Sequence, residues 1–244
     1  MIYCRFRFGD TEYSGAVEGD EVVAPGCRKP LADVRLLAPC LPSKIVCVGR
    51  NYAEHAAEMG NALPPNPLLF FKPPSAVIGP GDDIVYPRQS THVEFEGELG
   101  VVIGRRCRSV TRTNALDYVL GYTIVNDVTA RDLQRSDVQW ARAKGFDTFA
   151  PIGPYIVSGI EWRGRRLRTS LNGEIRQDAS TASMIFDVPS LIEYASAAFT
   201  LEPGDVIATG TPSGVAPMVG GDTVKIEIEG IGALTNRVVT LEAG

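Results

Sequence analysis

The most constraining feature of this sequence is the segment VEFEGELGVVI at residues 93–103. Apolar residues recur at alternate positions, a period typical of a β-strand. Glu96 and Glu98 are two positions apart, so both project from one face of such a strand. Like charges placed there repel each other unless a cation lies between them. We therefore expect a strand whose acidic face either binds a cation or is solvated.

A third carboxylate strengthens the first of these interpretations. Asp127 ends a second apolar run, residues 121–127. Hard divalent cations such as Mg²⁺ and Mn²⁺ prefer oxygen ligands, so Glu96, Glu98 and Asp127 are candidate ligands of one ion. The alternative is a half-buried strand with a solvated acidic face, which Glu94 would share. In that case Asp127 would cap a helix over residues 128–134.

Composition excludes several classes of function. The chain has 244 residues and a net charge of −5, which argues against binding a nucleic-acid backbone. No apolar run approaches the ~20 residues needed to cross a bilayer, and the first residues alternate like a strand rather than a signal peptide. Five irregularly spaced cysteines favour buried free thiols over a disulfide framework or a zinc site. We expect a cytoplasmic protein.

The pattern along the chain predicts an α+β fold dominated by mixed and antiparallel sheet. Residues 1–42 are expected to form a small N-terminal β module, ending in a proline-marked linker at 36–43, and residues 43–244 a larger β-rich domain. No strand–helix alternation of the doubly wound kind is present. In the larger part, strands are expected at 45–48, 68–72, 95–103, 121–126, 155–157, 206–209 and 224–228. Helices are expected at 53–59, from 130 to 133 or beyond, and at 188–199.

A short helix carries a candidate general base. Asn51 is a suitable N-cap and Gly60 a suitable C-terminal stop for it. His55 and Glu58 are three residues apart, so they face the same side. A carboxylate bonded to an imidazole fixes its tautomer and raises its basicity, as a base for water requires. The alternative is an ordinary surface pair. The proline-rich residues 63–67 that follow could form a lid.

Other polar residues are weaker candidates. Lys144 could supply a fixed positive charge beside a bound metal, although most isolated lysines are solvated. Arg131 and Gln134 are three apart and could both face a ligand, or form a solvent-facing helix stripe. The glycine-rich turn at 209–215 could hold a carboxylate through its hydroxyls and amides. The sequence contains no P-loop, no G-x-S-x-G, no G-x-G-x-x-G and no H-E-x-x-H.

Taken together, these segments resemble the fumarylacetoacetate hydrolase family, particularly its short bacterial acylpyruvate hydrolase and 2-hydroxyhepta-2,4-diene-1,7-dioate isomerase branch. The resemblance is carried, in order, by residues 48–52, 71–73, 96–104, 127–132, 144–147, 171–173 and 210–215. No single motif is decisive, but the ordered set is specific. The resemblance extends from about residue 44 to the end and implies a β-rich mixed-sheet roll with few short helices.

The resemblance also implies roles for individual residues. By position these are Mg²⁺ or Mn²⁺ ligands at Glu96, Glu98 and Asp127, a water-activating pair at His55 and Glu58, an active-site lysine at Lys144, and substrate contacts at Lys72, Arg131, Gln134 and Thr211. The pair would lie on a lid helix that orders on ligand binding. Longer family members carry a further aspartate upstream of the histidine, where this chain reads Ile-Val-Cys-Val at 45–48. A three-carboxylate site is therefore expected, and fumarylacetoacetate is a doubtful substrate.

The resemblance implies an enzyme acting on 2-oxo and 2,4-dioxo acids through a metal-stabilised enolate. The leading expectation is hydrolytic cleavage of a carbon–carbon bond in an acylpyruvate. The second is a 2-hydroxyhepta-2,4-diene-1,7-dioate isomerase or an oxo-diacid decarboxylase, because all three reactions share the enolate. A non-catalytic metal- or ligand-binding module is a remote alternative that has no use for His55, Glu58 and Lys144. A homodimer is also expected.

Overall fold

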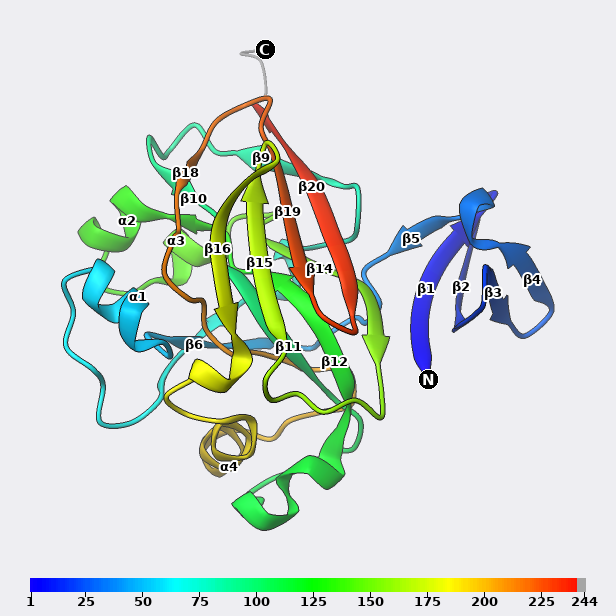
Figure 1. The fold of residues 1–244 in the computed structure, drawn as a ribbon, viewed down its shortest axis with the longest axis horizontal. Coiled ribbons are helices and arrows are strands. Elements are labelled where there is room, and N and C mark those ends of the chain that lie inside the picture. Colours follow the sequence, from blue (N-terminus) through cyan, green and yellow to red (C-terminus); the bar gives the residue numbers. More distant parts are fainter. Residues whose placement is uncertain (241–244) are drawn as a thin grey trace.

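Most of the structure, a computed structural model that describes residues 1–240, is built from three β-sheets (Figure 1). The largest, of twelve strands, has the order β4 (Cys27–Pro30), β3 (Glu21–Ala24), β2 (Thr11–Glu18), β1 (Ile2–Phe8), β14 (Ala150–Val157), β12 (Val119–Asn126), β11 (Gly97–Ile103), β17 (Val206–Ala208), β6 (Ile45–Gly49) and β7 (Leu68–Lys72), with β5 (Arg35–Leu37) on β1 and β8 (Val77–Ile78) on β14. The second has the order β16 (Glu174–Ser180), β15 (Arg166–Leu171), β19 (Thr223–Ile228), β20 (Gly232–Thr240) and β9 (Asp83–Tyr86). The third joins β13 (Thr129–Ala130), β10 (Val93–Glu94) and β18 (Pro217–Met218).

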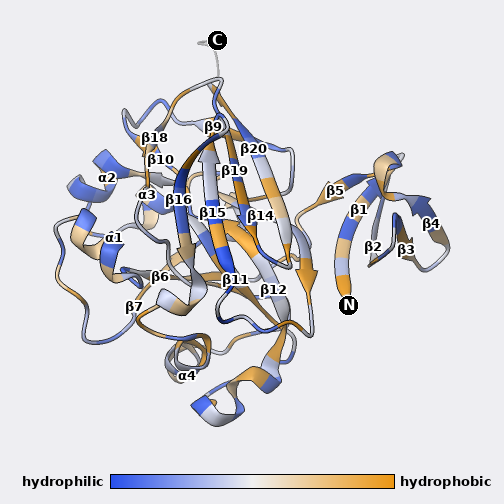
Figure 2. Ribbon diagram, in the orientation of Figure 1, coloured by the Kyte–Doolittle hydropathy of each residue, from blue (hydrophilic) through white to orange (hydrophobic). Residues whose placement is uncertain are grey.

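Parallel and antiparallel pairs occur together, which confirms the predicted β-rich mixed-sheet fold. The pairs β6–β17, β8–β14 and β9–β20 are parallel, and most others are antiparallel. The five-stranded sheet packs across β11, β12 and β14 (Figure 1). Strand β14 contains several hydrophobic residues, whereas the helix α2 (Arg131–Ser136) is largely hydrophilic (Figure 2).

Strand β11 is buried on both faces and lies at the centre of the largest sheet. Leu99 and Val101 belong to the core shared with the five-stranded sheet, and Val102 belongs to a second core on the opposite face. All of Gly97–Ile103 is buried. The strand expected over 95–103 begins two residues later, at Gly97, and a separate short strand, β10, ends at Glu94. A half-buried strand with a solvated acidic face is therefore excluded.

The N-terminal β-strands form a compact unit with a core of their own. Cys4, Phe6, Val22 and Cys27 are its buried members. Strand β1 pairs with β14 through Ile2 and its neighbour, which joins this unit to the largest sheet. The expected linker at 36–43 starts too early, because β5 extends to Leu37 and pairs with β1.

The helices are short, as expected. They are α1 (Ala53–Glu58), α2, α3 (Ala141–Gly145) and α4 (Val188–Ala198), with 3-10 turns η1 (Leu31–Asp33), η2 (Pro74–Ala76), η3 (Arg112–Tyr118) and η4 (Thr181–Ser183). Asp187 caps α4 by accepting from the Ser190 N–H. Among residues 1–240 no helix is both long and apolar enough to cross a membrane. All five cysteines are free and buried.

Of the two caps predicted for α1, the C-terminal one at Gly60 is confirmed and the N-terminal one is wrong. Gly60 has φ +67° and its N–H bonds the Ala57 carbonyl, while the N–H of Asn61 bonds Ala56, which is a Schellman C-cap. The N-cap, however, is Tyr52 and not Asn51. Asn51 is buried, and its side chain bonds the backbone of Phe186 and Thr209 instead. These bonds tie the segment before α1 to two distant parts of the chain.

Candidate active site

Two neighbouring strands bring the three predicted carboxylates together. Glu96 precedes β11 and Asp127 follows β12, and the two residues are joined by the Asp127 N–H bonding the Glu96 carbonyl at 2.9 Å. One oxygen from each of Glu96, Glu98 and Asp127 lies within 4.8 Å of the others, and all three residues are buried. Asp127 does not cap α2, whose N-cap is Ala130. The cluster is therefore not a solvated face.

Glu98 is the member that most needs a cation. Its carboxylate is 1% exposed, and its one hydrogen bond within residues 1–240 comes from the Gly210 N–H at 2.8 Å. Burial, followed by repulsion from Asp127 and Glu96, raises the pKa of Glu98 well above its ordinary value. Three buried carboxylate oxygens with this unbalanced charge fit Mg²⁺ or Mn²⁺, which also retain waters in their coordination.

Two buried lysines balance the rest of the cluster. The Lys144 ammonium donates to Glu96 Oε2 at 2.8 Å and to Asp127 Oδ2 at 2.7 Å. Burial lowers the pKa of Lys144, but Asp127 and Glu96 outweigh that effect and raise it, so the side chain remains charged. Lys72 donates to Asp127 Oδ1 at 2.5 Å and to the Val128 carbonyl at 3.0 Å.

Arg131 is held in one orientation by three neighbours. Its Nε donates to Glu94 at 2.6 Å, one terminal nitrogen bonds Glu96, and the other bonds the Gln134 carbonyl oxygen at 2.8 Å. Glu94 also contacts His92 Nε2 at 2.8 Å. The sequence indicates only a surface residue at Glu94, but the structure gives it a buried position in this network. Gln134 keeps its amide nitrogen as a donor for a ligand.

The predicted contact between His55 and Glu58 is formed on α1. His55 Nδ1 lies 3.1 Å from Glu58 Oε2, and the other oxygen of Glu58 accepts from the Gly214 N–H at 2.9 Å. His55 is 6% exposed, which excludes an ordinary surface pair. The glycine-rich turn at 209–215 does hold carboxylates, as expected, but they belong to the protein: Glu98 through Gly210 and Glu58 through Gly214.

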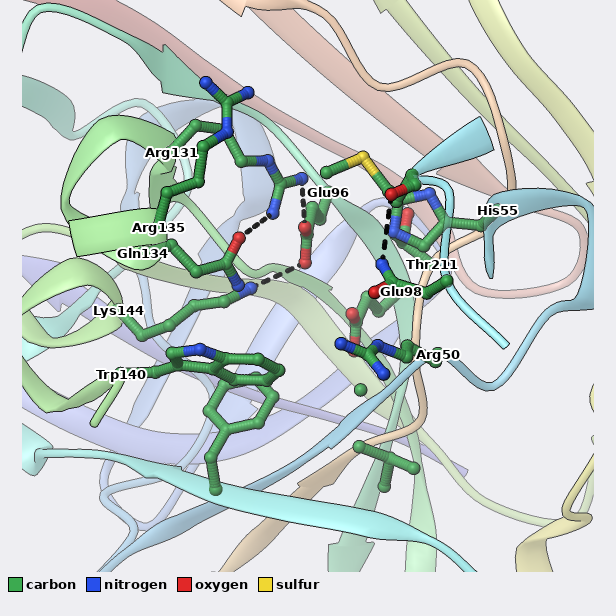
Figure 3. Close-up of a pocket in the computed structure, with 15 residues that line it drawn as sticks. Arg50, His55, Glu96, Glu98, Arg131, Gln134, Arg135, Trp140, Lys144 and Thr211 are labelled. Atoms are coloured by element: carbon green, nitrogen blue, oxygen red, sulfur yellow. Dashed lines mark hydrogen bonds and ion pairs between the residues drawn. The ribbon is translucent and has the colours of Figure 1, made fainter. Parts of the chain in front are cut away.

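A pocket of about 270 Å³ collects most of these side chains (Figure 3). Of the predicted residues, His55, Glu96, Glu98, Arg131, Gln134, Lys144 and Thr211 line it. Glu58, Lys72 and Asp127 do not line it. Lys72 bonds Asp127 and therefore supports a carboxylate rather than facing the pocket. The lining also contains Val48, Gly49, Arg50, Met59, Asn61, Phe70, Arg135 and Trp140, to which the sequence assigns no role. Arg50 could have been predicted as a pocket residue from the sequence, because it belongs to the segment 48–52 that carries the resemblance.

Gly97, which has no side chain, allows the five-stranded sheet to pack closely against the backbone between Glu96 and Glu98. A Cβ at Gly97 would lie 2.2 Å from Thr169 Oγ1 and 3.0 Å from Gln177 Oε1. The Gly97 N–H donates to Gln177, and its carbonyl accepts from the Thr211 hydroxyl. Gln177 donates in turn to Thr211. The absence of a side chain at Gly97 thus lets β15 and β16 fix the backbone between Glu96 and Glu98.

Replacing Gly97 with alanine should therefore damage both the fold and the cluster. We expect the free energy of unfolding to fall by about 2 kcal/mol, measured in urea, because the added methyl overpacks the contact with Thr169. Affinity for Mn²⁺, measured by calorimetry, should fall as well. Gly9→Ala is the control, because its methyl meets nothing within 4 Å, although its φ of +58° adds strain. Unchanged metal affinity in Gly97→Ala would contradict this role.

Comparisons with known proteins agree with this geometry. The family model "Fumarylacetoacetate (FAA) hydrolase C-terminal" matches residues 44–239. The oxaloacetate tautomerase YisK of Bacillus subtilis is 45% identical over 223 residues, which cover 85% of this chain and 74% of that protein.

Two solved structures are similar over nearly the whole chain. The 5-carboxymethyl-2-hydroxymuconate delta-isomerase from Mycobacterium smegmatis has a TM-score of 0.94 and 49% identity, with 100% of both chains covered. Maleylpyruvate hydrolase from Sphingobium sp. SYK-6, in complex with manganese (II) ion and pyruvate, has a TM-score of 0.84 and 34% identity, and 99% of this chain and 100% of that chain are covered. These relatives are named for three different reactions.

Proposed function

Because the chain belongs to the fumarylacetoacetate hydrolase family, we propose that it is a Mg²⁺- or Mn²⁺-dependent enzyme that cleaves an acylpyruvate by hydrolysis of a carbon–carbon bond. The supporting observation is the position of the His55–Glu58 pair. A histidine bonded to a carboxylate at 3.1 Å lines the same pocket as Glu96, Glu98 and Lys144. A base next to a metal-type cluster is what attack by water requires.

The cluster formed by Glu96, Glu98 and Asp127 would hold the ion. When bound, the ion supplies Lewis-acid stabilisation of negative charge on the oxygen at carbon 2 of a 2-oxo acid. Lys144 uses two of its three N–H donors on Glu96 and Asp127, so one donor remains for the substrate. Its ammonium adds a fixed positive charge where the oxygen becomes negative.

His55 would act on the water. In the neutral imidazole, a proton on Nδ1 would be bonded to Glu58, 3.1 Å away, and Nε2 would be free to take a proton from water. The hydroxide then attacks carbon 4 of a 2,4-dioxo acid. The bond between carbons 3 and 4 breaks, its electron pair moves toward the oxygen at carbon 2, and protonation of carbon 3 yields pyruvate and a second acid.

The second candidate is a 2-hydroxyhepta-2,4-diene-1,7-dioate isomerase, a tautomerase or an oxo-diacid decarboxylase. The names of YisK and of the mycobacterial structure favour it. These reactions also place negative charge on the oxygen at carbon 2, so Lys144 and the carboxylates would serve them equally. Decarboxylation needs neither an attacking water nor a base, so the His55–Glu58 pair favours hydrolysis over decarboxylation. Isomerisation and tautomerisation transfer protons and would use the same base.

A substrate panel tests the proposal directly. Chelator-treated protein should be inactive, and adding Mg²⁺ or Mn²⁺ should restore cleavage of 2,4-dioxo acids, with pyruvate identified by NMR. Decarboxylation and keto–enol exchange of oxaloacetate are followed on the same samples. Exchange or decarboxylation without cleavage of any 2,4-dioxo acid would favour the second candidate. Full activity after chelation would refute metal dependence.

A further inference from the structure

Arg50 is a half-buried cation of the pocket that has no partner within residues 1–240. Arg131 and Lys144 are both bonded to carboxylates. Arg50 and Arg135 have no hydrogen-bond or ion-pair partner within residues 1–240, but Arg135 is exposed whereas Arg50 is half-buried. A guanidinium that is partly removed from water without a counter-charge is costly. Such a position is expected to receive an anion from outside the chain.

The backbone at Arg50 is fixed in an uncommon conformation. Its φ is +58°, in the left-handed region that residues other than glycine rarely occupy. Strand β6 ends immediately before it, and Asn51 immediately after it is anchored to Phe186 and Thr209. Strain of this kind gathers at ligand-binding positions. Figure 3 shows the Arg50 side chain extending from the side of Glu98 toward the middle of the pocket.

Beside Arg50 the pocket borders a second hollow with a largely apolar lining. Arg50, Phe70 and Trp140 line both the main pocket and a neighbouring cavity of about 340 Å³. The rings of Phe70 and Trp140 pack edge to face with centroids 5.3 Å apart. The remaining lining of this cavity is Leu68, Leu69, Val138 and Gln139. A guanidinium beside an aromatic and aliphatic wall suits a carbon chain that ends in a carboxylate.

We infer that Arg50 binds the distal carboxylate of a dicarboxylic 2-oxo acid whose chain lies against Phe70 and Trp140. This rests on the proposed function, which places the 2-oxo acid end at Glu96 and Glu98. Charge agrees with a second carboxylate, because Arg131 and Lys144 are already paired with carboxylates whereas the Arg50 guanidinium has no counter-charge within residues 1–240. Arginine is suited to this task, because its planar fork binds a carboxylate through two parallel hydrogen bonds.

The test compares two unreactive ligands in the Mn²⁺-loaded protein by calorimetry. Pyruvate offers only the 2-oxo acid end, and 2-oxoadipate adds a carboxylate at the end of a chain. Arg50→Asn should weaken 2-oxoadipate binding by about 10- to 100-fold and leave pyruvate binding unchanged. Asparagine is chosen because it tolerates the positive φ. The 2-oxoadipate affinity of Arg50→Lys should lie between those of the wild type and Arg50→Asn, because lysine keeps the positive charge but cannot form two parallel hydrogen bonds to a carboxylate.

Arg135→Gln is the matched control, since it removes an exposed, unpartnered guanidinium from the same pocket. It should alter affinity for both ligands slightly and to a similar extent. The inference is overturned if Arg50→Asn leaves 2-oxoadipate binding unchanged, or weakens both ligands equally. If wild-type protein binds neither ligand with Mn²⁺, the proposed function fails and the inference falls with it. Pyruvate binding without any preference for 2-oxoadipate refutes the inference alone.

Discussion

Replacing Glu98 with glutamine is expected to abolish metal binding and to reduce turnover by roughly 10³-fold or more, because the substitution removes a ligand of the ion that stabilises the reacting oxygen. Glu98 has no cation partner within residues 1–240 and lies beside Glu96 and Asp127. The metal-free variant should nevertheless be at least as stable as the wild type. The amide fits the same space and removes a buried, uncompensated charge.

The pH dependence follows from the raised pKa of Glu98. Burial and the neighbouring carboxylates raise this pKa in the folded state. The contribution of Glu98 to stability is thus fully present below its ordinary, unfolded-state pKa and is lost as the pH rises toward the folded-state value. The stability gained by Glu98→Gln in metal-free protein should therefore be larger at neutral than at acidic pH. Thermal melts with and without Mn²⁺ across this range measure both effects.

Two controls make this result specific. Glu227→Gln changes an exposed strand glutamate paired with Lys225 at 2.8 Å and should affect neither metal binding nor turnover. Asp127→Asn should lose metal binding and also stability, because Lys72 and Lys144 lose a charged partner in the interior. A Glu98→Gln protein that binds Mn²⁺ as tightly as the wild type would remove the basis for the metal site.

The second large effect is expected at His55. His55→Ala should lower hydrolysis of an acylpyruvate by about 10²- to 10⁴-fold, the usual contribution of a positioned general base. Decarboxylation of oxaloacetate should fall much less, because it requires neither an attacking water nor removal of a proton from carbon. Mn²⁺ affinity should be unchanged, since His55 is not among the three clustered carboxylates. Initial rates of both reactions on one preparation give the comparison.

Glu54→Ala is the matched control on the same helix. Glu54 is exposed and contacts Ser213 at 3.3 Å, with no bond to His55. The Glu54→Ala substitution should leave the ratio of the hydrolysis rate to the decarboxylation rate unchanged. If His55→Ala lowers cleavage and decarboxylation equally, the pair does not activate water, and the isomerase or decarboxylase candidate replaces the hydrolase.

Local patterns were sufficient to predict some of the elements that position the site, but not α3, which carries Lys144. Alternation indicated the strand that carries Glu98, and the three-residue spacing placed His55 beside Glu58, because both relations act over a few residues. The hairpin of β15 and β16 could also have been predicted. Its loop, Asn172 and Gly173, has positive φ at both residues, and Asn-Gly is a strong hairpin signal.

Long-range contacts explain what sequence patterns could not provide. The position of Lys72 behind Asp127 depends on how β7 and β12 are placed in the sheet, and no local spacing encodes it. Glu94 looked like a surface residue because its burial comes from Arg131, far along the chain. The apolar wall at Trp140 likewise depends on α3 packing near β7. Strand β16 was missed because most of its residues are polar and only one of them is buried.

The separation of the carboxylate cluster from helix α1 has an evolutionary consequence. Glu96, Glu98 and Asp127 depend on central strands, whereas His55 and Glu58 belong to a six-residue helix on a connecting segment. If His55 activates water as proposed, a mutation at this position would change the reaction while the strands that hold the carboxylates stay in place. Under the proposed function, hydrolysis would then be gained or lost by few substitutions on one carboxylate scaffold.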